Sequence, residues 1–296
     1  MNLRADVKAY IDDNKLSQAK FAGLVGINSG ALSSWLNDKY TGNAETVEAP
    51  IISFFDKEGK RAEQATIDKI AFADTGISKR ISATLEYCRT QNIIGCIYGD
   101  AGVGKTATAR EWAKDKVDVL YITASVANCN PKPFFKKLAR ELKSPRSGQL
   151  DDIYSEVTEK LAITSKTIII DEAQHLTLKT LELVRSLNDE TDTAIVLIGN
   201  DKVYSKLLGK QQAEFAQLFS RIGMKLHILT DNFKLADIKA IFETRLDGEA
   251  NKFILDIAKS KYGLRGAIHV YINASNYGDK SKEGLMATAA HMGILA

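Results

Sequence analysis

The feature that most constrains this chain is a glycine-rich segment that directly follows a short apolar stretch. Residues 93–98 are Ile-Ile-Gly-Cys-Ile-Tyr, and residues 99–106 fit the pattern G-x-x-x-x-G-K-[ST]. The apolar stretch predicts a buried strand, and a helix is predicted from about 107 to 114. A strand, a glycine-rich loop and a helix in this order indicate a site for nucleotide phosphates. The alternative is a glycine-rich turn that matches the pattern by chance.

The residue types of this loop suit phosphate binding. Glycines let the backbone turn tightly, so that successive N–H groups point at phosphate oxygens. Lys105 would place a positive charge near the β- and γ-phosphates, and the Thr106 hydroxyl is a ligand for Mg²⁺. The predicted nucleotide-binding residues of the loop are Gly99, Asp100, Ala101, Gly102, Val103, Gly104, Lys105, Thr106 and Ala107.

A second predicted strand ends in two adjacent carboxylates. Residues 167–170 are Thr-Ile-Ile-Ile, and Asp171 and Glu172 follow. α/β sheets bind their ligands at the carboxyl ends of parallel strands. We expect Asp171 to hold Mg²⁺, directly or through water, and Glu172 to orient and polarise the attacking water. The alternative is a pair of charges at a helix N-terminus.

Two more polar residues come later in the chain. Asn200 follows a predicted strand at 194–198, where a polar side chain can sense the γ-phosphate. Arg221 ends a short predicted helix over 215–222, and its planar guanidinium suits the charge of phosphoryl transfer. The alternative for Arg221 is an ordinary salt bridge. Further strands are predicted at 119–123 and 225–229, and helices at 233–245, 250–261 and 267–276, with Arg265 in the turn between the last two.

The first sixty residues predict short helices joined by a glycine-containing turn. One helix is predicted over 7–14, another after Ser17 as N-cap, and a third from about Ser29, with a tight turn at 23–28. This arrangement resembles the helix-turn-helix domains of phage repressors, which implies that the last of these helices contacts DNA. The alternative is a helical bundle for protein contacts, since the segment carries about as many acids as bases. The candidate DNA-binding residues are Asn28, Ser29, Ser33 and Lys39.

A basic helical face is predicted within the nucleotide-binding region. Over residues 131–143 the apolar residues lie on one side of a helix, and lysines and arginines lie on the other. Such a face is commonly just solvated, and DNA contact is the functional alternative. Its candidate DNA-binding residues, with the loop that follows, are Lys136, Lys143 and Arg146.

Composition and charge limit the remaining options. The net charge of +3 over 296 residues does not by itself argue for nucleic acid, and no apolar stretch is long enough to span a bilayer. The three cysteines lack C-x-x-C spacing, which favours a reducing cytoplasm. A polar, charged stretch over 56–76 predicts a connector. We therefore expect a helix-turn-helix domain at 1–61, an α/β nucleotide-binding core with a parallel sheet at 62–230 and a helical lid at 231–296.

From about Ile77 the order of these features resembles the AAA+ ATPases. This resemblance implies a P-loop NTPase core that binds ATP and Mg²⁺ and completes hydrolysis at the subunit interface of a homo-oligomer. It implies that Asn200 is sensor 1, that Arg221 is the arginine finger reaching a neighbour's ATP, and that Arg265 is sensor 2 at the nucleotide.

Nearly the whole chain resembles a narrower family, the transposition B proteins of Mu-like bacteriophages. The matching blocks are the helix-turn-helix start, Gly-Asp-Ala-Gly-Val-Gly-Lys-Thr, Ile-Ile-Ile-Asp-Glu-Ala, Val-Leu-Ile-Gly-Asn and, most specifically, residues 214–222. The resemblance implies a protein of the bacterial host cytoplasm that assembles on double-stranded DNA as an ATP-dependent helical filament or ring. It implies little sequence preference, capture of target DNA for a DDE-type transposase, and stimulation of transposition.

Two other functions fit parts of the sequence. An ATP-switched transcription regulator would use the helix-turn-helix to bind one operator and the ATPase to control oligomerisation. A DEAH-type helicase is suggested by Asp-Glu-Ala-Gln-His at 171–175, but the chain is too short for two motor domains beside the N-terminal module.

Overall fold

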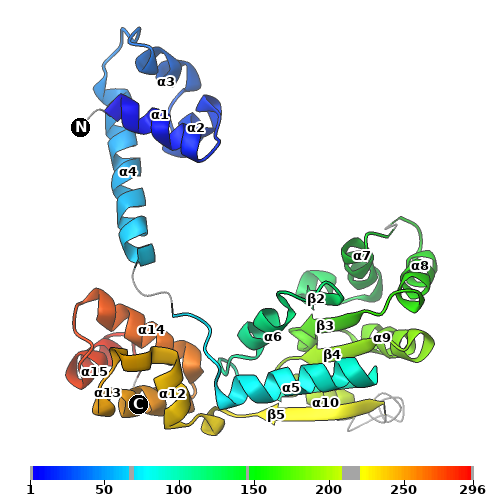
Figure 1. Cartoon of the computed structure of the whole chain (residues 1–296). Coiled ribbons are helices and arrows are strands. Elements are labelled where there is room, and N and C mark those ends of the chain that lie inside the picture. The colour runs from blue at the N-terminus through cyan, green and yellow to red at the C-terminus, as the bar shows by residue number, and fades with distance from the viewer. Residues whose placement is uncertain (1–2, 67–69, 145–146, 209–220, 295–296) are drawn as a thin grey trace. The chain divides into compact units, whose positions relative to one another are not determined.

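A five-stranded parallel sheet forms the centre of the larger part of the chain. In the computed structural model, which describes residues 3–66, 70–144, 147–208 and 221–294, its strand order is β2-β3-β4-β1-β5 (Figure 1). The strands are β1 (Ile94–Gly99), β2 (Val119–Thr123), β3 (Thr167–Asp171), β4 (Ala194–Ile198) and β5 (Ile222–Ile228). All neighbouring strands pair in parallel. Their carboxyl ends therefore meet at one edge of the sheet.

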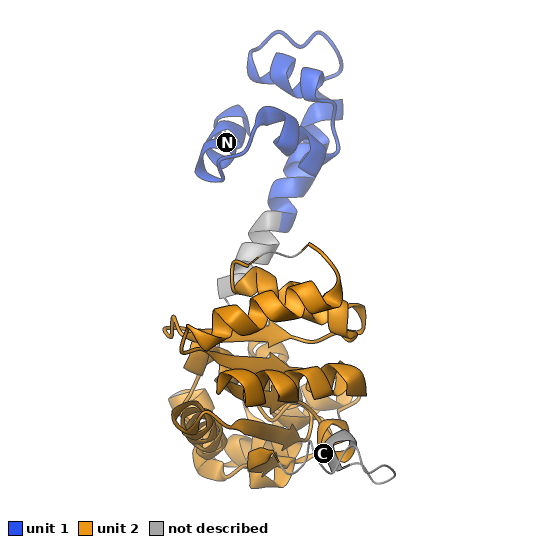
Figure 2. Cartoon of the chain, turned by 90° about the vertical axis from the view of Figure 1, so that its right-hand side faces the viewer, with its two compact units in different colours: residues 1–69 blue, residues 70–296 orange. Residues whose placement is uncertain are grey.

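The chain divides into two compact units, residues 1–69 and 70–296 (Figure 2). The expected boundary lay near residue 62, within a polar connector over 56–76. Helix α4 (Glu45–Thr66) continues through the first half of that stretch. Lysine, glutamate, glutamine and alanine, which fill it, are good helix formers, so a polar composition there does not require a loop.

Helices cover both faces of the sheet and form a hydrophobic core on each face. Successive apolar side chains of a strand therefore pack alternately into the two cores. On β3, Ile169 packs into one core, whereas Ile168 and Ile170 pack into the other. The first core holds α5 (Gly76–Gln91) and α6 (Lys105–Ala113). The second holds α7 (Pro131–Glu141), α8 (Leu150–Ala162) and α9 (Leu178–Thr191), with α10 (Asp201–Leu208) beside them. Burial on both faces is the reason that β1, β3 and β4 are almost continuously apolar.

Four helices after β5 form the C-terminal lid, and they share the first core. They are α12 (Leu235–Phe242), α13 (Gly248–Lys259), α14 (Gly263–Asn276) and α15 (Lys282–His291). The predicted α/β fold with a parallel sheet and a helical lid is thus confirmed. Two details were wrong. The helix expected over 233–245 ends at Phe242, where Glu243 has a φ of +52°, and the expected turn around Arg265 is instead the first turn of α14.

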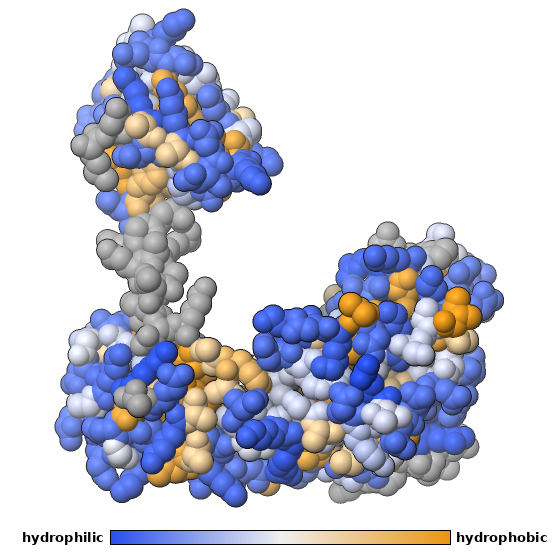
Figure 3. Space-filling view, in the orientation of Figure 1, coloured by the Kyte–Doolittle hydropathy of each residue, from blue (hydrophilic) through white to orange (hydrophobic). Residues whose placement is uncertain are grey.

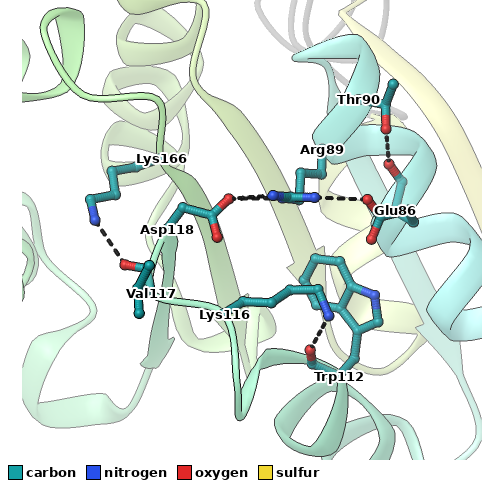
Figure 4. A network of polar contacts seen from close by, with 8 residues as sticks. All are labelled: Glu86, Arg89, Thr90, Trp112, Lys116, Val117, Asp118 and Lys166. Atoms are coloured by element: carbon teal, nitrogen blue, oxygen red, sulfur yellow. Dashed lines mark hydrogen bonds and ion pairs between the residues drawn. The ribbon is translucent and has the colours of Figure 1, made fainter.

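The amino-terminal end of the sheet carries a network of charged side chains (Figure 4). Arg89 of α5 donates through Nε to Oδ2 of Asp118 at 2.8 Å and through Nη1 to Oε1 of Glu86 at 2.8 Å. Lys166 Nζ donates to the Val117 carbonyl at 2.9 Å. Partial burial acts to raise the pKa of Asp118, but the Arg89 hydrogen bond, a backbone hydrogen bond and the charges of Arg89 and Lys166 together outweigh it, so the pKa lies below its ordinary value. This network ties α5 to the segment that enters β2.

The described residues of the N-terminal unit form α1 (Leu3–Asp13), α2 (Gln18–Val25), α3 (Ser29–Leu36) and α4 around a small core. Phe21, Leu32 and Trp35 are almost fully buried, and Trp35 Nε1 donates to Glu48 Oε1 at 2.9 Å. The turn between α2 and α3 is shorter than expected, because α2 continues to Val25. Among the described residues, no helix combines the length and the apolar composition needed to cross a membrane.

Candidate nucleotide site

The glycine-rich loop leaves β1 at the carboxyl edge of the sheet and leads into α6. Gly99, Gly102 and Gly104 have φ values of +130°, +75° and +91°, which other residues adopt only with strain. A Cβ atom at Gly99 would lie 1.9 Å from the Ile228 carbonyl oxygen of β5. The loop conformation therefore depends on these glycines, and it places backbone N–H groups at the start of a helix, where anions bind.

The Lys105 ammonium group is held inside the loop. Its Nζ donates to the carbonyl oxygens of Gly99 at 3.0 Å and Asp100 at 2.6 Å. Burial lowers the pKa of Lys105, whereas the carboxylates of Asp100 and Asp171, among others, act in the opposite direction. The cation is thus fixed, before any ligand arrives, where phosphate oxygens would compete for its hydrogen bonds.

Asp171 collects three hydrogen bonds at the end of β3. Its Oδ2 accepts from Thr106 Oγ1 at 2.9 Å and from Tyr121 Oη at 2.7 Å, and its Oδ1 accepts from the Glu172 N–H at 3.0 Å. The Asp171 carboxylate is buried. A hydroxyl and a carboxylate side by side are the hard oxygen ligands that Mg²⁺ prefers, with phosphates and waters completing its shell. Thr106 and Asp171 therefore fit the predicted magnesium site.

Glu172 and Asn200 follow two neighbouring strands and line one cavity with the loop. Glu172 has a left-handed backbone, and the Asn200 side chain accepts from the Lys202 N–H at 3.0 Å. Arg265 reaches the same cavity from the lid. The cavity measures about 460 Å³, and its lining residues are Ala101 to Ala107, Arg110, Asp171, Glu172, Gln174, Gly199, Asn200, Leu264, Arg265 and Ile268.

A second cavity of about 540 Å³ adjoins the first. It shares Val103, Gly104, Ala107, Arg110, Leu264 and Ile268 with the polar cavity, so the two lie on either side of common lining residues. Its other lining residues are Ile70 to Ala73 before α5, Thr75 and Ser78, Thr108, Glu111 and Lys114, and the lid residue Ile241. In Figure 3, apolar surface gathers where this segment meets the lid. Sequence analysis missed this cavity, because its walls come from segments far apart in the chain.

The lid packs directly against the glycine-rich loop. Gly263, at the start of α14, has a φ of +62°, and a Cβ atom there would lie 2.8 Å from the Ala101 carbonyl oxygen. On the other side of the loop, Asp100 Oδ2 accepts from the Thr230 N–H at 2.8 Å and from its hydroxyl at 3.1 Å. These contacts hold the first turn of α14, and with it Arg265, beside the loop.

Arg221 lies at the other end of the sheet. It directly precedes Ile222, which pairs with Ile94 at the start of β1, whereas Gly99 pairs with Ile228. The length of β1, about 16 Å, thus separates Arg221 from the loop of its own chain. Its exposed guanidinium forms an ion pair with Asp189, with Nε 3.4 Å from Oδ1. The structure therefore does not bring Arg221 to the cavity that holds the other predicted site residues.

The candidate DNA-binding residues fall in both units. Asn28 caps α3, because its Oδ1 accepts from the Gly30 N–H at 2.8 Å. Ser29 and Lys39 are exposed and Ser33 is half-buried. In the other unit, Lys136 and Lys143 are exposed. Lys136 lines an open groove of about 600 Å³ with Asn128, Pro133, Lys137 and Arg140. Arg146 and residues 214–220 lie outside the described residues.

Comparisons with known proteins show which proteins this chain resembles. Residues 88–207 match the family model described as AAA domain. The Mu-like prophage FluMu DNA transposition protein B of Haemophilus influenzae is 34% identical over 280 residues, which are 92% of this chain and 96% of that protein. The ATP-dependent target DNA activator B of Escherichia phage Mu is 32% identical over 269 residues, 88% of this chain and 84% of that protein.

Among solved structures, domain III of the Thermotoga maritima replication initiation protein DnaA resembles the chain with a TM-score of 0.49 and 19% identity. The match covers 74% of this chain and 94% of that one.

Proposed function

The chain belongs to the family of Mu-type DNA transposition B proteins, and from this premise we propose an ATPase that assembles on target DNA and presents it to a DDE-type transposase. The observation that carries the proposal is the pair of adjoining cavities beside the glycine-rich loop. One cavity is lined by loop backbone, a lysine and carboxylates, and the other is mostly apolar. This division matches the two halves of ATP, a charged triphosphate and a flat base.

The phosphates are assigned to the polar cavity. The loop N–H groups and Lys105 bind the β- and γ-phosphates, and Arg265 approaches them from the lid. Thr106 and Asp171 hold Mg²⁺, which neutralises phosphate charge when bound. The base is assigned to the apolar cavity between Ile70 and Ile241.

Hydrolysis is assigned to Glu172 and Asn200 at the carboxyl ends of β3 and β4. The Glu172 carboxylate accepts a hydrogen bond from the attacking water, orients it and takes its proton. Asn200 donates to the γ-phosphate through its side-chain amide. Both side chains line the cavity that the loop and Lys105 also line. The proposed general base Glu172, the sensor Asn200 and the phosphate-binding groups therefore face the same cavity.

Arg221 is assigned to the ATP of a neighbouring subunit. It is exposed and lies about one strand length from the loop of its own chain, so contact with its own nucleotide is not feasible. An exposed ion pair such as Arg221–Asp189 contributes little free energy, and the guanidinium is therefore available to a partner. Hydrolysis would then depend on assembly.

DNA contact is assigned to weak basic sites that repeat from subunit to subunit. The α7 groove with Lys136, together with Lys143, supplies phosphate contacts, and the start of α3 supplies others. Each contact is modest, but nucleotide-bridged subunits would align many of them along one duplex. Such contacts are made to the sugar-phosphate backbone of DNA and not to its bases, so little sequence preference is expected.

Electron microscopy and protection mapping on long duplex DNA test this function. With ATP, the Glu172→Gln protein, which we expect to bind ATP without hydrolysing it, should cover any duplex uniformly, and without nucleotide it should not. Affinity should fall steeply with salt, with a log–log slope of about −0.9 per phosphate contacted. Protection of a single sequence, independent of ATP, would contradict target capture and favour the transcription regulator.

A further inference from the structure

Gln174 lies between the ends of two neighbouring strands. β3 and β4 pair with Ile170 opposite Leu197, so the residues that follow these strands are neighbours. After β3, Glu172 adopts a left-handed backbone and a 3₁₀ turn, η2 (Ala173–His175), begins. The His175 N–H donates to the Glu172 carbonyl at 3.0 Å and closes this turn. Gln174 is thereby held beside the residue assigned to water activation.

The Gln174 amide uses both of its ends. Its Nε2 donates to Oε2 of Glu172, and its Oε1 accepts from the backbone N–H of Asn200 at 3.4 Å. The two partners fix the orientation of the amide, because a carboxylate only accepts and a backbone N–H only donates. A flipped amide would lose both hydrogen bonds. One side chain therefore joins the carboxylate after β3 to the backbone after β4.

Gly199 provides the space for this contact. A Cβ atom at residue 199 would lie 2.3 Å from Gln174 Oε1 and 2.4 Å from Val203 Cγ2. Gly199 is buried, and its φ is not in the left-handed region that favours glycine, so its backbone conformation is open to other residues. Glycine is needed at this position because it has no side chain, and not because of its backbone conformation. The space that it leaves lets the Gln174 amide reach the end of β4.

We propose that Gln174 is a positioning residue that holds the Glu172 carboxylate in a fixed relation to Asn200. When Asn200 contacts a γ-phosphate, the end of β4 moves with Asn200. Gln174, which is hydrogen-bonded to both residues, then moves the Glu172 carboxylate that orients the water. Hydrolysis is then coupled to correct seating of the γ-phosphate. The role proposed for Gln174 is to position Glu172, and no contact with the phosphate or the water is assigned to it. This inference rests on the proposed ATPase function.

Three variants test this coupling. Gln174→Met keeps the length of the side chain and removes both hydrogen bonds. Gln174→Glu keeps an acceptor for the Asn200 N–H but places a second carboxylate against Glu172. Gly199→Ala leaves Gln174 in the sequence but adds a methyl group that displaces its side-chain amide. Gln91→Met, on the exposed end of α5, is the matched control.

Single-turnover hydrolysis and the affinity for a non-hydrolysable ATP analogue are measured separately. For Gln174→Met we expect affinity within about twofold of the parent and hydrolysis lower by about 10²-fold, the typical cost of a small misplacement of a reacting group. Gly199→Ala should likewise lower hydrolysis with little change in affinity, and Gln91→Met should change neither quantity. Hydrolysis at the parent rate in Gln174→Met, or an equal loss of affinity, would overturn the proposal.

Gln174→Glu gives a second test, which remains available if Gln174→Met fails to fold. Its carboxylate would repel the carboxylate of Glu172 and displace it from the attacking water, so hydrolysis should fall in this variant as well. Hydrolysis at the parent rate in Gln174→Glu would contradict the proposal.

Glu172→Gln separates failure of this inference from failure of the proposed function. If Glu172→Gln is inactive while Gln174→Met is normal, Glu172 acts without Gln174 and only the coupling is wrong. If Glu172→Gln hydrolyses ATP at the parent rate, the assignment of the base itself is wrong.

Discussion

The nucleotide site and the helical N-terminal unit place similar small polar residues in different surroundings. In the larger unit, Thr106 and Asn200 lie at the carboxyl edge of a sheet and line a cavity, although Asn200 Oδ1 also accepts from the Lys202 N–H. In the N-terminal unit, Ser17 and Asn28 cap α2 and α3 by accepting hydrogen bonds from backbone N–H groups. The comparison teaches that a polar residue at an element's end indicates a ligand only where the surrounding fold leaves a space for one. Variants in the two units test whether this difference between them holds.

Replacing Lys105 tests whether nucleotide binding belongs to the larger unit. Lys105→Ala should remove measurable ATP binding, because it deletes the side-chain cation that the loop holds ready for the β- and γ-phosphates. The measurement is a titration with a fluorescent ATP analogue. Lys252→Ala, an exposed lysine of α13, is the control and should bind normally. Unchanged affinity in Lys105→Ala would refute the site.

Replacing Arg221 tests whether the site is complete within one chain. Arg221→Ala should bind ATP normally and hydrolyse it about 10³-fold more slowly, as expected for loss of an arginine finger. Lys225→Ala, an exposed cation of β5, serves as the control. Mixing Arg221→Ala with Glu172→Gln protein should restore some activity, since mixed interfaces can combine an intact Glu172 with an intact Arg221. No recovery despite co-assembly would argue against action between subunits.

Replacing a core residue of the N-terminal unit tests whether the two units are energetically separate. Leu32→Ala should destabilise that unit by about 3 kcal/mol, because it leaves a cavity among buried side chains. Calorimetry should show one transition moving while the ATP affinity of the other unit stays the same. Leu24→Ala, at an exposed position of α2, should move neither transition. Loss of ATP affinity in Leu32→Ala would show that the units depend on each other.

Replacing Asp118 has the smallest expected effect and is confined to the larger unit. The pKa of Asp118 is lowered in the folded chain, so its contribution is present above the unfolded pKa, about 3.9, and is lost as pH falls through the folded pKa. Asp118→Asn should therefore cost about 0.5 kcal/mol at pH 7. The difference from the parent should vanish in strong acid. The exposed Asp115→Asn is the control, and a pH-independent difference would contradict the account.

The sequence predicted those parts of the site that depend on local order. The loop from Gly99 to Thr106, the carboxylates after β3 and Asn200 after β4 were placed together because parallel strands share one carboxyl edge. Their catalytic roles stay predictions. The fold class followed from the same alternation of strands and helices.

Other features depend on contacts between distant residues and left no local pattern. Tyr121 reaches Asp171, and Gln174 reaches Asn200, only because the sheet brings neighbouring strands together. The apolar cavity joins the segment before α5 to the lid. α4 was not predicted at all, and beyond residue 56 its charged helix formers resemble a connector in composition. Asn28 was considered for DNA contact, although its position before α3 also favours a cap.

The central claim is that residues 70–296 carry both the nucleotide site and ATP-dependent assembly on DNA. The most direct test compares this fragment, which has its own cores, with the full chain by imaging on duplex DNA with and without ATP. We predict that the fragment still assembles when ATP is present, with a lower affinity for DNA. A fragment that hydrolyses ATP but never assembles on DNA would contradict the claim and place the DNA site in the N-terminal unit.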